Sequence, residues 1–290
     1  ACFSRAEPGG PLVTMTDFDL SPFKAIIFDC YGTLVDWESG IYTGLQPLLA
    51  RFPSSATWSR KEALLAFTEI EKDLQASDPS ILYRDLLSQA HRVLTRTLQE
   101  THAGEIPVSI PEEEHAAFGQ SIKDWPVFPD TCEALRVLEQ HYKLTILSNV
   151  DHNSFAATHA KLSQDTANQS AYVRGAAPGQ NWLPKSISGC KSPFSLILTA
   201  QDTGAYKPDP SSMSCALDAI RSEFGVDGSQ VLVVAQSLFH DVDPSSRMGI
   251  SAVWIDRQGA VMGLETSGEA PKWKRRFETL GEMAASLEAT

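Results

Sequence analysis

Lys24-Ala25-Ile26-Ile27-Phe28-Asp29-Cys30-Tyr31-Gly32-Thr33-Leu34-Val35-Asp36 is the stretch from which the architecture of the chain can be worked out. Ala25 to Phe28 is a short apolar run with β-branched residues, a pattern typical of a buried parallel strand. The run ends at Asp29, and Gly32 allows the backbone to turn sharply afterwards. Open α/β folds bind ligands at the carboxyl ends of their strands. Asp29 is therefore expected at such an edge, where a carboxylate can act as a nucleophile.

Helical patterns without strands follow this first strand. Apolar residues recur at helical spacing over Ser39 to Phe52, Ser59 to Leu74 and Ile81 to Leu98. We therefore expect residues 37–123 to form a helical domain inserted directly after the strand that carries Asp29. A domain in that place is expected to act as a cap that closes over the strand end and excludes water.

Strands and helices alternate in the rest of the chain. Apolar runs predict further strands at Lys143 to Leu147, Ser195 to Leu198, Val231 to Ala235 and Ala252 to Ile255. This alternation predicts an α/β fold with a doubly wound parallel sheet, built from residues 15–36 and 124–290. Residues 159–193 are polar and rich in Gly, Pro and Ser, so we expect a long surface insertion within this core domain.

Composition limits the classes of partner. The formal net charge of −12 argues against a nucleic-acid partner, whereas a small anionic substrate is still possible where a few cations gather. The five cysteines are widely spread and indicate free thiols in a reducing compartment, so we expect a cytoplasmic protein. No apolar run is long enough to span a bilayer, so we expect no membrane partner. Residues 1–14 precede Met15 and are interpreted as a tag or upstream extension.

Four strand ends are followed by polar groups that can form one site. These polar groups are Asp29 with Thr33, Ser148 with Asn149, Lys207, and the segment from Gln236 to Asp241. In a parallel sheet these ends meet at the same edge, so residues far apart in sequence are expected to lie together.

These motifs resemble those of the haloacid dehalogenase (HAD) superfamily. Asp29 to Leu34 resembles its nucleophile motif, Ser148 its second motif, Lys207 its third, and Val231 to Asp241 its fourth. The resemblance covers approximately residues 23–257 and implies a Rossmann-like core with an inserted helical cap of the C1 type. It also implies that Asp29 is the nucleophile, that Thr33 and Ser148 hold the anionic or leaving group, and that Lys207 neutralises carboxylate charge.

Two positions in these motifs distinguish the phosphatases of this superfamily from its dehalogenases. Its phosphatases usually have Asp two residues after the nucleophile, as general acid, and Gly-Asp in the fourth motif, where the Asp holds Mg²⁺. Tyr31 and Ala235-Gln236 occupy these positions. Halide leaves without a proton, and an amide is a poor substitute for a carboxylate on a hard cation. The pattern therefore resembles the type II L-2-haloacid dehalogenases, and implies conversion of a 2-haloalkanoate to a 2-hydroxy acid through an Asp29 ester, without metal or cofactor.

The same resemblance implies further substrate contacts. Ser148 and the backbone N–H of Asn149 are candidates for binding the substrate carboxylate, and Tyr31 for lining the site. Arg51, Arg60 and Arg84 are candidates for binding the halide, and the separation of Arg60 from the nucleophile is nearest to that of the dehalogenases.

The fourth motif departs from the dehalogenase pattern. Ser237 is expected in place of the usual Asn, and either His240 or Asp241 in place of the Asp that activates water. Met213 stands where those enzymes commonly have Tyr. The alternatives are a phosphatase that uses Mg²⁺, a protein recruited to another reaction, and a ligand-binding protein without turnover. Because related dehalogenases are often dimers, a homodimer is possible.

Overall fold

A six-stranded parallel sheet forms the centre of the part of the chain that the computed structural model describes, residues 18–101, 109–175, 177, 179–265 and 273–288. The strand order is β3-β2-β1-β4-β5-β6. The strands are β1 Ala25–Phe28, β2 Lys143–Ser148, β3 Leu196–Thr199, β4 Val231–Ala235, β5 Ser251–Ile255 and β6 Arg275–Phe277. β1 lies between β2 and β4, with Phe28 opposite Ile146 and Val234. The strand that carries Asp29 is therefore central, as a doubly wound sheet requires.

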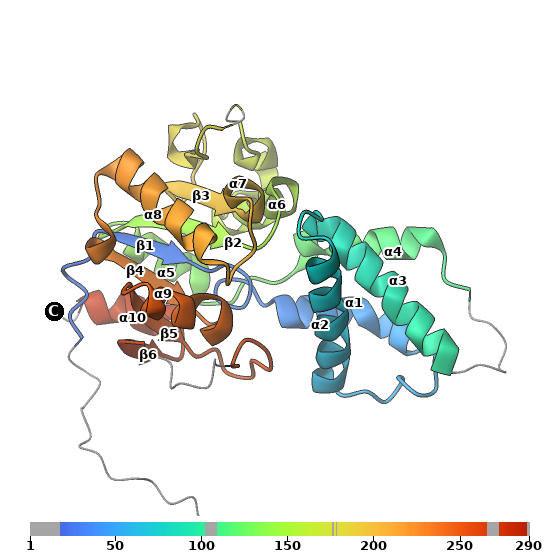
Figure 1. The fold of residues 1–290 in the computed structure, drawn as a ribbon. Helices are drawn as coiled ribbons and strands as arrows, with labels where there is room; N and C mark the ends of the chain where they lie inside the picture. Colours follow the sequence, from blue (N-terminus) through green and yellow to red (C-terminus); the bar gives the residue numbers. More distant parts are fainter. Residues whose placement is uncertain (1–17, 102–108, 176, 178, 266–272, 289–290) are drawn as a thin grey trace, which may run out of the picture.

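Helices cover both faces of this sheet (Figure 1). Alternate residues of β1 enter two separate apolar clusters, Ile26 and Phe28 on one face and Ala25 and Ile27 on the other. The first face packs against α5 Thr131–Leu138, α6 His152–Leu162 and α10 Leu280–Glu288. The second packs against α8 Pro210–Phe224. The short helices α7 Ala200–Thr203 and α9 Asp243–Arg247 follow β3 and β4 respectively. Burial on both faces explains the continuous apolar strands of the sequence.

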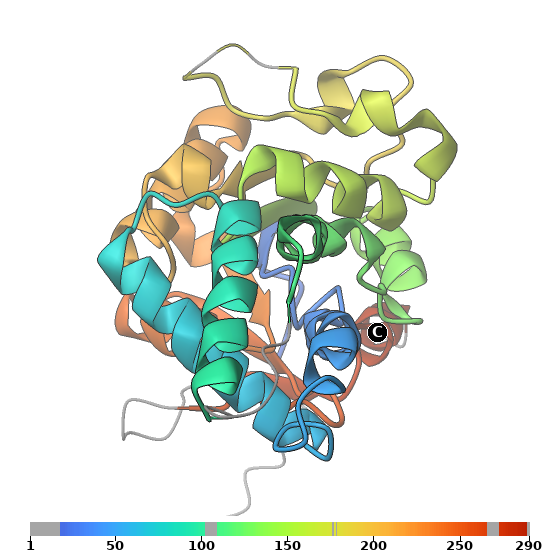
Figure 2. The same cartoon turned by 90° about the vertical axis from the view of Figure 1, so that its right-hand side faces the viewer.

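The segment after β1 forms four helices, which we call the helical unit. They are α1 Trp37–Leu49, α2 Arg60–Ser77, α3 Tyr83–Thr101 and α4 Glu112–Gly119, followed by the 3₁₀ turn η1 Ser121–Asp124. Ser59 caps α2 by accepting from the backbone N–H of Glu62, whose carboxylate accepts from that of Ser59 in return. The unit lies beyond the end to which the β1 arrow points, and Figure 2 shows it in front of the sheet. It therefore faces the edge at which the strands end.

The segment 159–193, expected as a surface insertion, is exposed or partly exposed over most of its described residues but is anchored by a few buried side chains. α6 continues to Leu162, and the 3₁₀ turns η2 Thr166–Tyr172 and η3 Pro184–Ser186 follow. Tyr172 and Trp182 are buried, with exposed fractions of 0% and 1%. The imidazole of His159 packs edge-on to both rings. Its few large aromatic residues are thus enough to attach this polar segment to the core domain.

Two further short turns complete the described elements. They are the 3₁₀ turn η4 Gly228–Gln230 and the π-helical turn η5 Leu238–Val242. The expected tag at residues 1–14 lies outside the described residues. Among the residues that are described, no helix is long and apolar enough to cross a membrane.

Candidate active site

Asp29 lies directly after β1 and is held by its neighbours. Its backbone N–H donates to the Val234 carbonyl at 3.2 Å, which continues the pairing with β4. Gly32 then adopts a φ of 102°, a conformation that favours glycine and that returns the chain toward Asp29. As a result, the Thr33 hydroxyl donates to Asp29 Oδ2 at 2.8 Å. The Asp29 side chain is therefore fixed at the edge of the sheet, with an exposed fraction of 7%.

Lys207 joins this carboxylate to a second one. Its ammonium Nζ lies 2.8 Å from Asp29 Oδ1 and 2.7 Å from Asp241 Oδ1. Burial lowers the pKa of Lys207, but the two carboxylates more than offset this effect, and the net result is a raised pKa. Lys207 thus remains charged at neutral pH. We call Asp29, Thr33, Lys207 and Asp241 the Asp29 cluster.

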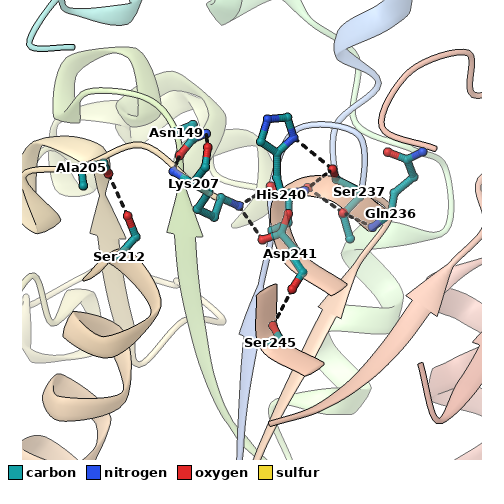
Figure 3. Close-up of polar contacts among 11 residues, drawn as sticks. Asn149, Ala205, Lys207, Ser212, Gln236, Ser237, His240, Asp241 and Ser245 are labelled. Atoms are coloured by element: carbon teal, nitrogen blue, oxygen red, sulfur yellow. Dashed lines mark hydrogen bonds and ion pairs between the residues drawn. The ribbon is translucent and has the colours of Figure 1, made fainter. Parts of the chain in front are cut away.

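The end of β2 supplies two residues with different roles. The Asn149 amide donates to the Lys207 carbonyl at 3.0 Å and accepts from the Lys207 N–H at 2.7 Å, so it fixes the backbone of Lys207 (Figure 3). Ser148 is 2% exposed, and its hydroxyl has no hydrogen-bond partner among the described residues. A buried hydroxyl without a partner is costly, so Ser148 is well suited to a polar group of a substrate.

The segment after β4 reaches the same edge. The Gln236 N–H donates to the Thr33 hydroxyl at 2.8 Å, while its side-chain amide donates to the Met262 carbonyl at 2.9 Å. The Ser237 hydroxyl accepts from the His240 N–H at 3.1 Å and lies 3.0 Å from His240 Nδ1 (Figure 3). Burial and the nearby Lys207 lower the pKa of His240 to about 4, so its imidazole is neutral at pH 7.

Asp241 and His240 are not equivalent as bases. Asp241 is part of the Asp29 cluster, and its second oxygen, Oδ2, is buried without a partner among the described residues. Burial raises the pKa of Asp241, the Lys207 contact opposes this, and the charge of Asp29 adds to it. A carboxylate with a raised pKa is a better proton acceptor than an ordinary surface carboxylate.

Tyr31 contacts α6 and Trp125. Its hydroxyl lies 3.0 Å from the Thr158 hydroxyl, and its ring meets that of Trp125 edge-on at a centroid distance of 5.5 Å. Burial raises the pKa of Tyr31 well above its usual value. Tyr31, two residues after Asp29, is therefore a neutral side chain at neutral pH.

A comparison with protein families agrees with this arrangement. The model of the haloacid dehalogenase-like hydrolases matches residues 23–243. The chain belongs to this family. The match begins before β1 and includes the helical unit and the whole Asp29 cluster.

Individual relatives in the family are distant. The (S)-2-haloacid dehalogenase 4A of Burkholderia cepacia is 25% identical over 238 residues, which cover 81% of this chain and 84% of the relative. The L-2-haloacid dehalogenase structure from Xanthobacter autotrophicus has a TM-score of 0.61 and 19% identity, over 92% of this chain and 99% of that one. A HAD hydrolase from Bacillus subtilis, bound to magnesium, has a TM-score of 0.58 and 14% identity over the same shares. These structures show a common fold.

Arg60, the residue expected to bind the halide, pairs with carboxylates at the start of the helical unit through its Nη2 atom, while its Nε is buried without a partner among the described residues. Its guanidinium lies 3.2 Å from Glu38 and 3.5 Å from Asp36, and it also donates to the Gly259 carbonyl at 3.4 Å. Glu38 in turn accepts from the backbone N–H groups of Val261 and Met262. Arg60 therefore connects α2 to the loop after β5.

Arg257 and Glu38 were missed by the analysis of the sequence. Arg257 donates twice to the Thr33 carbonyl, at 3.0 and 2.8 Å, and pairs with Asp130 at 2.7 Å. It thus fixes the turn after Asp29. A signal was present for Arg257, because it follows the end of β5, a fifth strand end at the same edge. Glu38 gave no signal, since an acidic residue in a first helical turn is common.

Among the described residues at this edge, the buried carboxylate oxygen without a partner is Asp241 Oδ2, which alone is a poor site for a magnesium ion. Both oxygens of Asp29 are already bonded to Thr33 and Lys207, and the Gln236 side chain is directed to Met262. In the described part of the chain, no three His, Cys, Asp or Glu side chains gather as a metal site. Mg²⁺ prefers several oxygen ligands, usually including carboxylates. We therefore assign no step of the chemistry to a metal ion.

Proposed function

We propose that this HAD-family hydrolase converts an (S)-2-haloalkanoate to a 2-hydroxy acid through an ester on Asp29. The observation that carries the proposal is the Asp29 cluster, in which a buried carboxylate is held by one hydroxyl and one ammonium group. Such a carboxylate is oriented for attack and needs no metal to be held in place. The neutral Tyr31 beside it also suits a leaving group that departs without a proton.

The substrate carboxylate is assigned to the end of β2. The Ser148 hydroxyl, buried and without a protein partner, is a donor for one carboxylate oxygen. The Asn149 backbone N–H is the neighbouring donor, since the Asn149 side chain is bonded to Lys207. Fixed donors of this kind bind an anion without reorganisation. The substrate is therefore a small anion.

The first step forms the ester. An Asp29 oxygen attacks C2 of the substrate from the side opposite the halogen, the new C–O bond forms, and the C–X electron pair leaves with the halide. Attack from the opposite side inverts the configuration at C2. The helical unit, which faces this edge of the sheet, acts as a cap that keeps water from the ester as it forms (Figure 2).

The second step hydrolyses the ester. Asp241 accepts a proton from a water molecule, whose oxygen attacks the Asp29 carboxyl carbon. The bond between the Asp29 carboxyl carbon and the ester oxygen breaks, and the departing oxygen takes the proton held by Asp241, so that the product leaves as a 2-hydroxy acid. The new Asp29 carboxyl group loses the second proton of the water molecule to solvent and regains its carboxylate. Asp241 is favoured over His240 because it contacts Lys207 and has a free oxygen, whereas His240 is bonded through Nδ1 to Ser237.

The test is halide release from L-2-chloropropionate and bromoacetate, with EDTA and again with Mg²⁺, beside an aryl phosphate. We expect halide release that is unaffected by EDTA, and no release from the Asp29→Asn variant. Phosphate release that requires Mg²⁺ would instead establish a phosphatase. Absence of turnover on every substrate would reject the dehalogenase proposal and favour another reaction or a binding role.

A further inference from the structure

The turn that follows β2 is bonded to the neighbouring strand and helix. Ser148, the last residue of β2, is paired with Thr199, the last residue of β3. The backbone N–H of Ala200, the first residue of α7, donates to the Val150 carbonyl at 3.2 Å. The turn that carries the proposed donors for the substrate carboxylate is therefore held by the end of β3 and the start of α7.

Asp202 of α7 joins the end of β3 to the start of α6. Its Oδ2 accepts from both the backbone N–H and the hydroxyl of Thr199, at 2.9 Å each. Its Oδ1 lies 2.8 Å from Nε2 of His152, the first residue of α6. The His152 N–H also donates to the side chain of Gln201 at 3.2 Å. This one carboxylate thus contacts residues on both sides of the turn after Ser148.

Arg174 brings a positive charge to Asp202 from the segment 159–193. It follows η2, and its Nη1 contacts both Asp202 Oδ1 and the His152 ring. Its Nη2 donates to the Gln180 carbonyl at 2.6 Å. The side chains of Arg174 and Asp202 are 14% and 9% exposed. Because Arg174 Nε is buried without a partner among the described residues, the guanidinium is held in place through Nη1 and Nη2.

Asp202 needs this cation because its carboxyl group is ionised. Burial raises the pKa of Asp202, but the hydrogen bonds from His152 and Thr199 outweigh burial, and the net result is a lowered pKa. Removing one partner of a largely buried ion pair leaves the other partner's charge without compensation. Loss of Arg174 should therefore disturb Asp202 and the two chain segments that it joins.

A second contact attaches the segment 159–193 at the same place. The Trp182 carbonyl accepts from the Ile197 N–H at 2.9 Å, as a bridge to β3, which is an edge strand. The Trp182 ring meets the imidazole of His152 edge-on at a centroid distance of 6.0 Å. The ionic contact of Arg174 and the aromatic contact of Trp182 therefore meet at the first residue of α6.

We propose that Arg174 is a positioning residue for the substrate carboxylate, acting through Asp202 on the turn after β2. A turn held in this way keeps the Ser148 hydroxyl and the Asn149 backbone N–H at fixed positions. This inference rests on the proposed function, in which these two groups bind the carboxylate. The substrate carboxylate keeps its charge throughout displacement at C2. A looser turn therefore weakens binding of the substrate and of the transition state equally, which raises KM and leaves kcat unchanged.

Arg174→Met removes the charge and keeps most of the side-chain length. We expect KM for L-2-chloropropionate to rise about fivefold and kcat to stay within about twofold, because the donors are misplaced and the reacting groups are not. Arg174→Lys keeps a cation for Asp202 and should restore most of the KM. Arg136→Met is the control and should keep the wild-type KM, because Arg136 donates to Ser163 and Gln164 of the same segment. A wild-type KM in Arg174→Met would overturn the inference.

A double-variant cycle with Ser148→Ala separates positioning from a general loss of structure. If Arg174 acts on the turn that carries Ser148, the two substitutions share one target. The double variant should then raise KM by clearly less than the product of the two single effects. A KM equal to that product would mean that Arg174 acts independently of Ser148, and would overturn the inference.

Binding of propionate, a carboxylate without a leaving group, separates this inference from the proposed reaction. Calorimetric titration of the full chain, against sodium chloride of equal ionic strength, should give a Kd about fivefold higher in Arg174→Met than in the wild type. Weaker binding in Arg174→Met, in a chain that releases no halide from any substrate, would retain the positioning role and reject the reaction. Equal binding by the two proteins, or no binding by the wild type, would reject the inference even in an active dehalogenase.

Discussion

Replacing Lys207 by Met tests how much the Lys207 ammonium group contributes to the free energy of unfolding. The substitution keeps most of the side-chain volume but leaves Asp29 and Asp241 buried without their shared cation. Removing one partner of a buried ion pair typically costs about 3–5 kcal/mol. We expect a loss of this size in the free energy of unfolding at pH 8. Lys185→Met, which removes an exposed ion pair with Glu139, should cost about 0–1 kcal/mol.

The loss should depend on pH with a definite sign. Burial already raises the pKa of Asp241 above its unfolded value, and the loss of Lys207 raises it further. A carboxyl group with a raised pKa in the folded state favours folding at low pH and loses that contribution as pH rises through the raised value. The destabilisation of Lys207→Met should therefore be smaller at pH 5.5 than at pH 8.

Urea unfolding at the two pH values, followed by far-UV circular dichroism, measures both effects. The double variant Lys207→Met with Asp241→Asn should recover part of the stability at pH 8, because it leaves one buried charge where the single variant has two. Equal losses at pH 5.5 and pH 8, or a loss no larger than that of Lys185→Met, would refute this account of the Asp29 cluster.

Three further substitutions test the proposed chemistry. Asp29→Asn should abolish turnover with an unchanged circular dichroism spectrum; activity that does not arise from deamidation would remove Asp29 as nucleophile. Asp241→Asn should slow hydrolysis of the ester, so intact-protein mass spectrometry should detect a covalent adduct on Asp29; an adduct that instead accumulates only in His240→Gln would transfer the base role to His240. Ser148→Ala should raise KM about tenfold or more, since a hydrogen bond to a charged group is worth about 1.5–3 kcal/mol; an unchanged KM would place the substrate carboxylate elsewhere.

Much of the fold could be predicted from the sequence because its central strands are buried on both faces. The runs at β1, β2, β3, β4 and β5 are apolar throughout, and each predicted strand overlaps the observed one. The short β6 has two Arg residues in three positions, so its sequence carries no such signal. The polar residues that follow the strands could be predicted as a group, because parallel strands end at one edge.

Contacts between distant parts of the chain could not be predicted in the same way. The role of Arg60 in halide binding stays a prediction, and its contact with Glu38, a carboxylate buried in the same helical unit, gave no signal in the sequence. Trp182 was hidden in a polar segment because one large ring contributes little to average composition. The expected homodimer stays a prediction.

The hydrogen bond from Tyr206 to Ile81 has a consequence for how the helical unit is attached. Tyr206 and Lys207 are adjacent, so the residue that touches the helical unit and the residue that binds the nucleophile share one peptide bond. One end of this dipeptide is bonded to the helical unit, and Asn149 fixes the backbone of the other end. The loop before α8 thus joins the helical unit directly to the ammonium group that neutralises Asp29.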